Sequence, residues 1–122
     1  MNDTLTLFWP VGPQELELIH MSGYRAFPPH ARVRLPGQPI FYPVLNMNYA
    51  VQIARDWNTR ACYADAGGGY VTRFRVRADF ILKYAVQTVG DTIHQELWIP
   101  AEGLPALNEN IVGEIDVIAT FK

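Results

Sequence analysis

The segment from His94 to Pro100 constrains the fold more than any other, because its side chains alternate and it ends at a proline, as a β-strand does. Successive side chains of a strand point to opposite faces, so Gln95, Leu97 and Ile99 share one face, which is the natural core face. The other face carries His94, Glu96 and Trp98. If that face lines a cleft, an imidazole, a carboxylate and an indole lie close enough together for chemistry. If it faces water, the segment is an ordinary edge strand.

Composition limits the kinds of protein that the chain can be. Its 122 residues are 49% hydrophobic and 18% charged, which fits one globular domain over residues 1–122. A formal net charge of −2 argues against bulk electrostatic binding of nucleic acid. No apolar run approaches the ~20 residues that cross a bilayer, and the first residues lack the basic region of a secretory signal. The single Cys62 excludes an internal disulfide and a cysteine-pair metal site, so we expect a cytoplasmic protein.

Two segments are typical of helices. The first spans residues 13–22, begins with a proline and ends at Gly23, which we expect to be a left-handed cap. The second spans residues 47–57 and follows Asn46, a favourable N-cap residue. Its large apolar side chains recur every four residues beside two alanines, which allow a close approach to a sheet: Tyr49, Ile53 and Trp57, with Ala50 and Ala54.

Six further segments read as strands, namely residues 4–9, 40–45, 70–77, 84–89, 94–100 and 115–121. Pro10 is expected to end the first of them. Gly90-Asp91 predicts a tight turn that joins residues 84–89 and 94–100 in a hairpin. Shorter helical turns are expected at residues 79–83 and 101–108. The pattern predicts an α+β fold with a mixed or mostly antiparallel sheet of about six strands and two main helices.

Arginines gather in two places. The proline-rich segment 24–39 carries Arg25 and other basic residues, and it is either a solvated surface loop or a loop that closes over an anionic ligand. In the strand 70–77, Arg73, Arg75 and Arg77 share one face. A solvated sheet face is the favoured interpretation of this row and a track for phosphate groups the alternative. The charges also discourage edge-to-edge pairing of strands.

Several runs together resemble a group of small bacterial proteins known by the label "ADP-ribosylation/crystallin": PVGPQELELI, SGYRAFPP, QPIFYPVLNMNYAVQIARDWN, GYVTRFRVRADFI, YAVQTVG, HQELWIPAEGL and IVGEIDVI. They cover nearly the whole chain. The order of strands and helices, with a late strand ending in ELWIP, is also similar to the ADP-ribosyltransferase fold. That resemblance implies NAD as the substrate, and a protein or small molecule as the acceptor of ADP-ribose.

The resemblance also implies roles for particular residues. Glu96 in HQELWIP stands where the superfamily has its catalytic glutamate, and His94 stands where an earlier Gln or Glu is usual, which is a departure. Trp9 stands where the first strand usually offers Arg or His to NAD, a second departure. Tyr42, and Tyr49 in the following helix, match the region that usually contacts NAD.

The chemistry of such a transfer assigns a task to each side chain. Cleavage between nicotinamide and ribose develops a ribosyl cation, which the Glu96 carboxylate can stabilise while it holds a ribose hydroxyl. His94 can bind ribose or act as a base. Tyr42 or Trp9 can stack on the nicotinamide ring, although both, like Tyr49, also fit a core position. Arg25 can neutralise the pyrophosphate.

Two other functions stay open on the sequence alone. The chain can be a catalytically inactive module that binds a nucleotide or a partner on the same fold, which the missing Arg or His of the first strand favours. It can also be a structural or interaction protein, for example half of a homo-oligomer that meets its partner through the Arg73, Arg75 and Arg77 face or through a sheet edge. None of the three functions requires a metal.

Overall fold

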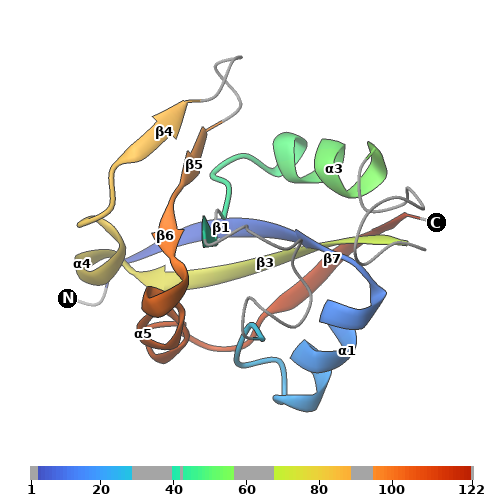
Figure 1. Cartoon of the computed structure of the whole chain (residues 1–122), viewed down its shortest axis with the longest axis horizontal. Coiled ribbons are helices and arrows are strands. Elements are labelled where there is room, and N and C mark those ends of the chain that lie inside the picture. The colour runs from blue at the N-terminus through green and yellow to red at the C-terminus, as the bar shows by residue number, and fades with distance from the viewer. Residues whose placement is uncertain (1–2, 29–39, 42, 57–67, 89–94, 122) are drawn as a thin grey trace.

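The computed structural model describes residues 3–28, 40–41, 43–56, 68–88 and 95–121, which form an α+β fold (Figure 1). Its elements are β1 (Thr4–Val11), α1 (Pro13–Met21), β2 (Ile40–Phe41), α3 (Met47–Asp56), β3 (Gly69–Arg77), α4 (Ala78–Ile81), β4 (Val86–Thr88), β5 (Gln95–Leu97), β6 (Ile99–Pro100), the 3-10 turn η1 (Ala101–Gly103), α5 (Leu104–Glu109) and β7 (Asp116–Phe121). Helices α1 and α3 confirm the predictions at 13–22 and 47–57 over the described residues, and α4 and α5 confirm the shorter turns.

The strands pair in an antiparallel arrangement, as predicted. β3 lies between β1 and β7, and β4 pairs with β5, as the predicted hairpin requires, whereas its predicted turn at Gly90-Asp91 lies outside the described residues. Val44 connects these two groups, because it bridges to Phe8 of β1 on one side and to Glu96 of β5 on the other. The order across the molecule is therefore β4, β5, the segment around Val44, β1, β3 and β7, and the β2–β6 pair continues the same register.

Pro10 does not end the first strand, contrary to the prediction. β1 runs through it to Val11, with Pro10 opposite Val71 of β3. Phe8 exchanges backbone hydrogen bonds with Val44 at 2.9 and 2.8 Å, so the polar groups of its backbone point away from β3. Pro10 lies two residues further on and has the same orientation, so its missing N–H removes no bond between β1 and β3.

The core lies on both faces of this sheet. One face packs against α1 and α5, through Leu7 and Phe74 of the sheet and Ile19 and Leu107 of the helices. The other face packs against α3, whose fully buried Ala50 and Ala54 lie against Val44 and Val71 (Figure 1). Alternate residues of β1 and β3 therefore point to opposite faces of the sheet, which confirms the predicted alternation.

Helix α3 is fixed at both ends. At its beginning, the side-chain oxygen of Asn46 accepts hydrogen bonds from the backbone N–H groups of Asn48 and Tyr49 at 2.8 and 3.3 Å, which confirms Asn46 as the N-cap. Near its end, Ala54 lies so close to Gly69 of β3 that a Cβ added to Gly69 would stand 2.1 Å from the Ala54 carbonyl oxygen. The alanines therefore allow the close approach that the sequence predicted.

The arginines of β3 are exposed, as the favoured interpretation of their alternation predicted. β3 is however the central strand of the three, so these charges do not protect a sheet edge. Opposite them, an irregularity between Val71 and Thr72 shifts the register of β7, so Ala119 faces Val71 while Asp116 faces Arg73. Simple alternation along residues 115–121 places Asp116 and Ala119 on opposite faces, and the extra residue of this bulge brings both to the arginine face.

Candidate functional site

Glu96 is a buried carboxylate that holds two hydrogen bonds, one on each oxygen. Its side chain is 7% exposed. The Tyr49 hydroxyl donates to Oε2 at 2.9 Å, and the indole Nε1–H of Trp98 donates to Oε1 at 2.6 Å. A buried carboxylate is strongly unfavourable without such donors, so these two bonds hold it in one orientation.

Three parts of the fold bring these side chains together. The hydrogen bond from the Leu45 N–H to the Gln95 carbonyl, 3.0 Å, and that from the Leu97 N–H to the Pro43 carbonyl, 2.9 Å, fix β5 beside the Val44 segment. Leu97 and Ile99 are buried in the core, as predicted, which turns Glu96 toward α3. The capped first turn of α3 then places Tyr49 over the carboxylate.

Of the residues that the sequence proposed for a site, the structure brings Glu96 and Tyr49 together. His94 and Tyr42 lie outside the described residues. Trp9 is a core residue, 2% exposed, and its indole donates a hydrogen bond to the Glu15 carboxylate at 2.9 Å. Its side chain lies on the α1 face of β1, and that of Phe8 lies on the opposite face. Glu96 belongs to the Phe8 face, because Val44 pairs with both residues. We therefore leave Trp9 out of the site.

Arg25 is exposed and follows the end of α1. The helix ends with Gly23 in the left-handed region at φ 78°, as predicted, and the Tyr24 N–H reaches back to the Ile19 carbonyl at 3.0 Å. The Ser22 hydroxyl accepts a hydrogen bond from the Arg25 N–H at 3.2 Å, which fixes the turn. The described contacts give Arg25 no place beside Glu96.

Reasoning from the sequence missed two contacts, one at the Glu96 site and one in the core under α1. Trp98 was placed on the Glu96 face but given no task, although its i, i+2 spacing on a strand was a usable signal. Glu15 was missed entirely, because a glutamate in the first turn of a helix is ordinarily an exposed partner of the helix dipole. Here it is 1% exposed and bound to Trp9, and no local pattern indicates that contact.

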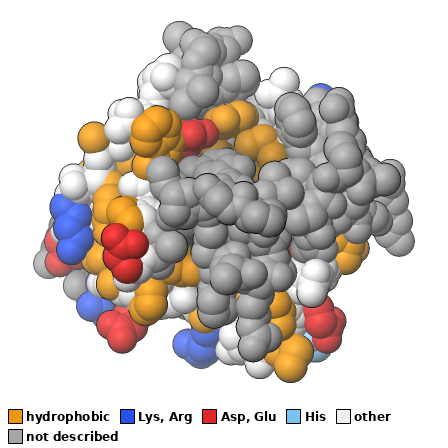
Figure 2. Space-filling model, in the orientation of Figure 1, with side chains coloured by type: hydrophobic (Ala, Val, Ile, Leu, Met, Phe, Trp, Pro, Cys, Tyr) orange, Lys and Arg blue, Asp and Glu red, His pale blue; other side chains and the backbone are white. Residues whose placement is uncertain are grey.

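The surface around Glu96 is partly apolar. The Trp98 indole, which donates to Glu96, is 44% exposed, and Met47, two residues before Tyr49 in the first turn of α3, is also 44% exposed. Figure 2 shows hydrophobic side chains reaching the surface beside acidic ones on the face turned to the viewer. An indole that is half exposed and tied to a carboxylate offers a flat surface to a ring and an acceptor to a hydroxyl group.

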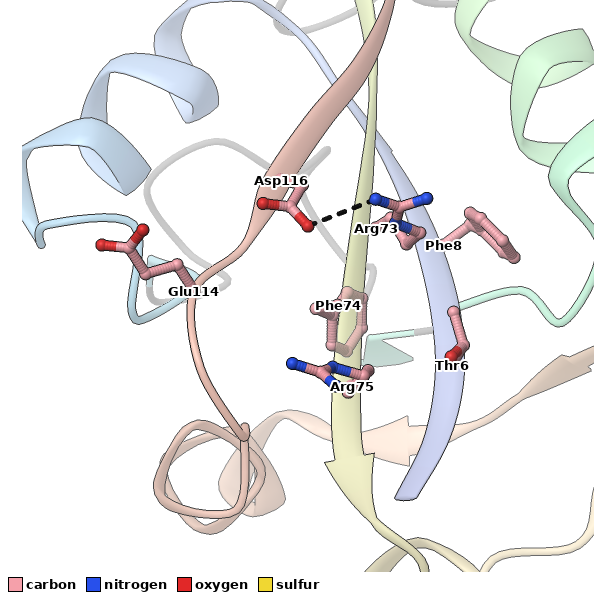
Figure 3. Close-up of a pocket in the computed structure, with 7 residues that line it drawn as sticks. All are labelled: Thr6, Phe8, Arg73, Phe74, Arg75, Glu114 and Asp116. Carbon is pink, nitrogen blue, oxygen red and sulfur yellow. Dashed lines mark hydrogen bonds and ion pairs between the residues drawn. The ribbon is translucent and has the colours of Figure 1, made fainter. Parts of the chain in front are cut away.

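A hollow of about 510 Å³ lies on the arginine face of the sheet, and we call it the arginine hollow (Figure 3). It is lined by Thr6, Phe8, Arg73, Phe74, Arg75, Glu114 and Asp116. Arg73 forms an ion pair with Asp116 at 3.5 Å, with side chains 49% and 57% exposed. Arg75 forms no ion pair with any residue that the structure describes.

Within the described ranges, no group of three His, Cys, Asp or Glu side chains is arranged to hold a metal ion. No helix among them is both long and apolar enough to cross a membrane. Comparison with models of protein families, with curated protein sequences and with solved structures finds no match for this chain. The resemblance to ADP-ribosyltransferases therefore stays a prediction, and the case for a function depends on the site itself.

Proposed function

We propose that the protein is an ADP-ribosyltransferase-like enzyme that cleaves the bond between nicotinamide and ribose in NAD, with Glu96 as the catalytic carboxylate. The observation that carries the proposal is the orientation of the buried Glu96 carboxylate by Tyr49 and Trp98. A carboxylate fixed in a site of low dielectric stabilises a developing cation more strongly than one that is free in water.

The two hydrogen bonds leave Glu96 able to bind a ligand. Each carboxylate oxygen has two lone-pair positions, and each accepts one described bond, from Tyr49 or from Trp98. A ribose hydroxyl can therefore donate to the remaining position, while the negative charge faces the anomeric carbon. In this arrangement Tyr49 and Trp98 are positioning residues, and the half-exposed indole of Trp98 is suited to stack on a planar ring.

The second candidate function is nucleotide or partner binding without catalysis. It is favoured by the same contacts, because donors on both oxygens spread the negative charge of Glu96 and reduce its ability to stabilise a cation. The two functions differ in their products. The enzyme releases nicotinamide from NAD, and the binding module holds the nucleotide unchanged.

The deciding experiment follows nicotinamide release from NAD by the full chain and by Glu96→Gln. The substitution keeps an oxygen for the Trp98 indole and removes the charge, so the fold should persist while the rate falls by about 100-fold or more. Glu102→Gln is the control, because Glu102 is an exposed glutamate that has no described contact with the site. Equal rates for both variants, or no release by the wild type, would contradict the enzyme proposal.

Thermal melting of the same proteins separates the second function from the first. NAD at ~100 times its dissociation constant adds about 2.7 kcal/mol to the stability, which raises the melting temperature by several degrees in a domain of this size. A rise without nicotinamide release identifies a binding module. If NAD neither raises the melting temperature nor releases nicotinamide, it is neither the substrate nor the ligand of this protein.

A further inference from the structure

We propose that the arginine hollow binds the two phosphate groups of the nucleotide whose ribose lies at Glu96. This inference rests on the proposed function, and it assigns a site that the resemblance does not. The alternation of β3 left a phosphate track open as the alternative interpretation of its arginines. Three features of the hollow support that alternative, namely its charge, its spacing and its register with Glu96.

The lining of the hollow holds two arginines and two carboxylates, so its formal charge is zero, and the positive charge open to an anion is that of Arg75. Arg75 has no ion pair among the described residues, and its guanidinium borders the hollow. Arg73 is held by Asp116 at 3.5 Å, but both side chains are about half exposed, and ion pairs of this kind contribute ~0–1 kcal/mol. A phosphate can therefore take Arg73 from Asp116 at little cost. Figure 3 shows the Glu114 carboxylate turned away from both arginines.

The spacing of the side chains suits a diphosphate. Arg73 and Arg75 stand two residues apart on one strand, which separates them by about 6.5–7 Å on the same face. Guanidinium groups bind phosphate oxygens in pairs, so two of them at this spacing can share the oxygens of one diphosphate. Thr6 lies opposite Arg75 in the register and adds a hydroxyl donor. Phe8 lies opposite Arg73 and adds a ring.

The register places the hollow and Glu96 on one face of the sheet. Arg73 pairs with Phe8, Phe8 with Val44, and Val44 with Glu96. Directly paired residues point to the same side of a sheet, and neighbouring strands are about 4.8 Å apart. Three such steps separate the backbones of Arg73 and Glu96 by roughly 14 Å. The side chains of both residues cover part of that distance, which leaves room between them for a ribose and the diphosphate attached to it.

The test measures the binding of ADP by calorimetry, with adenosine as the probe without phosphates. The wild type should bind ADP at least tenfold more tightly than adenosine, and Arg75→Gln should remove that preference. Arg77→Gln is the matched control, because Arg77 lies on the same face of β3 and loses the same charge but does not line the hollow. Equal losses in the two variants, or no ADP binding by the wild type, would overturn the inference.

NAD turnover keeps the failure of this inference separate from the failure of the proposed function. If both are right, Arg75→Gln raises the KM for NAD about tenfold and changes kcat less, whereas Glu96→Gln lowers kcat. Binding of ADP that depends on Arg75, in a protein that releases no nicotinamide, supports the phosphate site and rejects the transferase. Nicotinamide release with an unchanged KM for NAD in Arg75→Gln supports the transferase and rejects the phosphate site.

Discussion

At the scale of single residues, Glu96 shows how a charge becomes stable inside this protein. Its side chain is nearly enclosed, yet each of its oxygens accepts a hydrogen bond, so the carboxylate keeps much of the stabilisation that water would supply. The two donors differ in one respect. Trp98 can only donate, whereas the Tyr49 hydroxyl can donate or accept. A glutamine at position 96 can therefore satisfy both neighbours, and an alanine can satisfy neither.

Tyr49→Phe tests the hydrogen bond directly. It removes the hydroxyl and keeps the ring, so the Glu96 carboxylate loses one of its two donors, which we expect to lower the free energy of unfolding by about 1–3 kcal/mol. Urea denaturation measures that change. The matched control is Tyr70→Phe, because the partly buried Tyr70 has no hydroxyl partner among the described residues and should change stability little. Equal effects of the two substitutions would mean that the bond contributes no net stability.

The site could be predicted in part, and the residues explain which part. The alternation along 94–100 correctly placed Glu96 and Trp98 together and turned Leu97 into the core, because the period of a strand is local information. The partnership of Glu96 with Tyr49 joins residues 47 positions apart, and it depends on how α3 crosses the sheet. The same limit applies to Trp9, whose position in the core depends on Glu15 of the following helix.

At the scale of elements, the contact between α3 and β3 positions the site. Ala50 and Ala54 are fully buried, and the missing side chain of Gly69 lets the helix backbone rest almost on the strand. Gly69 is needed here for its lack of a Cβ. The helix begins at the Asn46 cap, and the contact between Ala54 and Gly69 fixes the orientation of its axis. That orientation determines where the first turn places Tyr49.

Gly69→Ala should separate these two elements. The new Cβ would stand 2.1 Å from the backbone oxygen of Ala54, which cannot turn aside as a side chain can, so we expect a loss of about 3 kcal/mol in unfolding free energy. Gly68→Ala is the neighbouring control, because a Cβ added to Gly68 would have its nearest neighbours at 3.5 and 3.6 Å, which are ordinary van der Waals distances. Denaturant unfolding of both variants measures the difference, and a stable Gly69→Ala protein would show that α3 can move away freely.

The elements themselves were largely predictable, and their connections were not. The helices, the hairpin pairing and the alternation of β3 follow from local periodicity and caps, and the structure confirms them. β1 can continue through Pro10 because the backbone of this residue points away from β3. The sequence alone does not indicate which edge of β1 pairs with β3. The bulge in β7 likewise depends on its pairing with β3, and it decides that Asp116 reaches the arginine face.

At the scale of the whole molecule, two apolar clusters share the same strands. Leu7 and Phe74 belong to the cluster under α1 and α5, while Phe8 and Val71 belong to the cluster under α3. Successive residues of β1 and β3 thus serve opposite layers. Neither layer can come apart without disrupting strands that the other requires, so the described fold should behave as one cooperative unit.

Single core substitutions, one in each of the two layers, test this cooperativity. Leu7→Ala should lower the free energy of unfolding by about 2–5 kcal/mol and Val71→Ala by about 2 kcal/mol, because both side chains are fully buried. Thr120→Ala, at an exposed position of β7, should change it by less than about 0.5 kcal/mol. Thermal unfolding is followed by far-UV and near-UV circular dichroism. The two signals should fall together in every variant, since each substitution weakens strands common to both layers. A Val71→Ala protein that loses its near-UV signal in a separate step from its far-UV signal would show that the α3 layer unfolds independently.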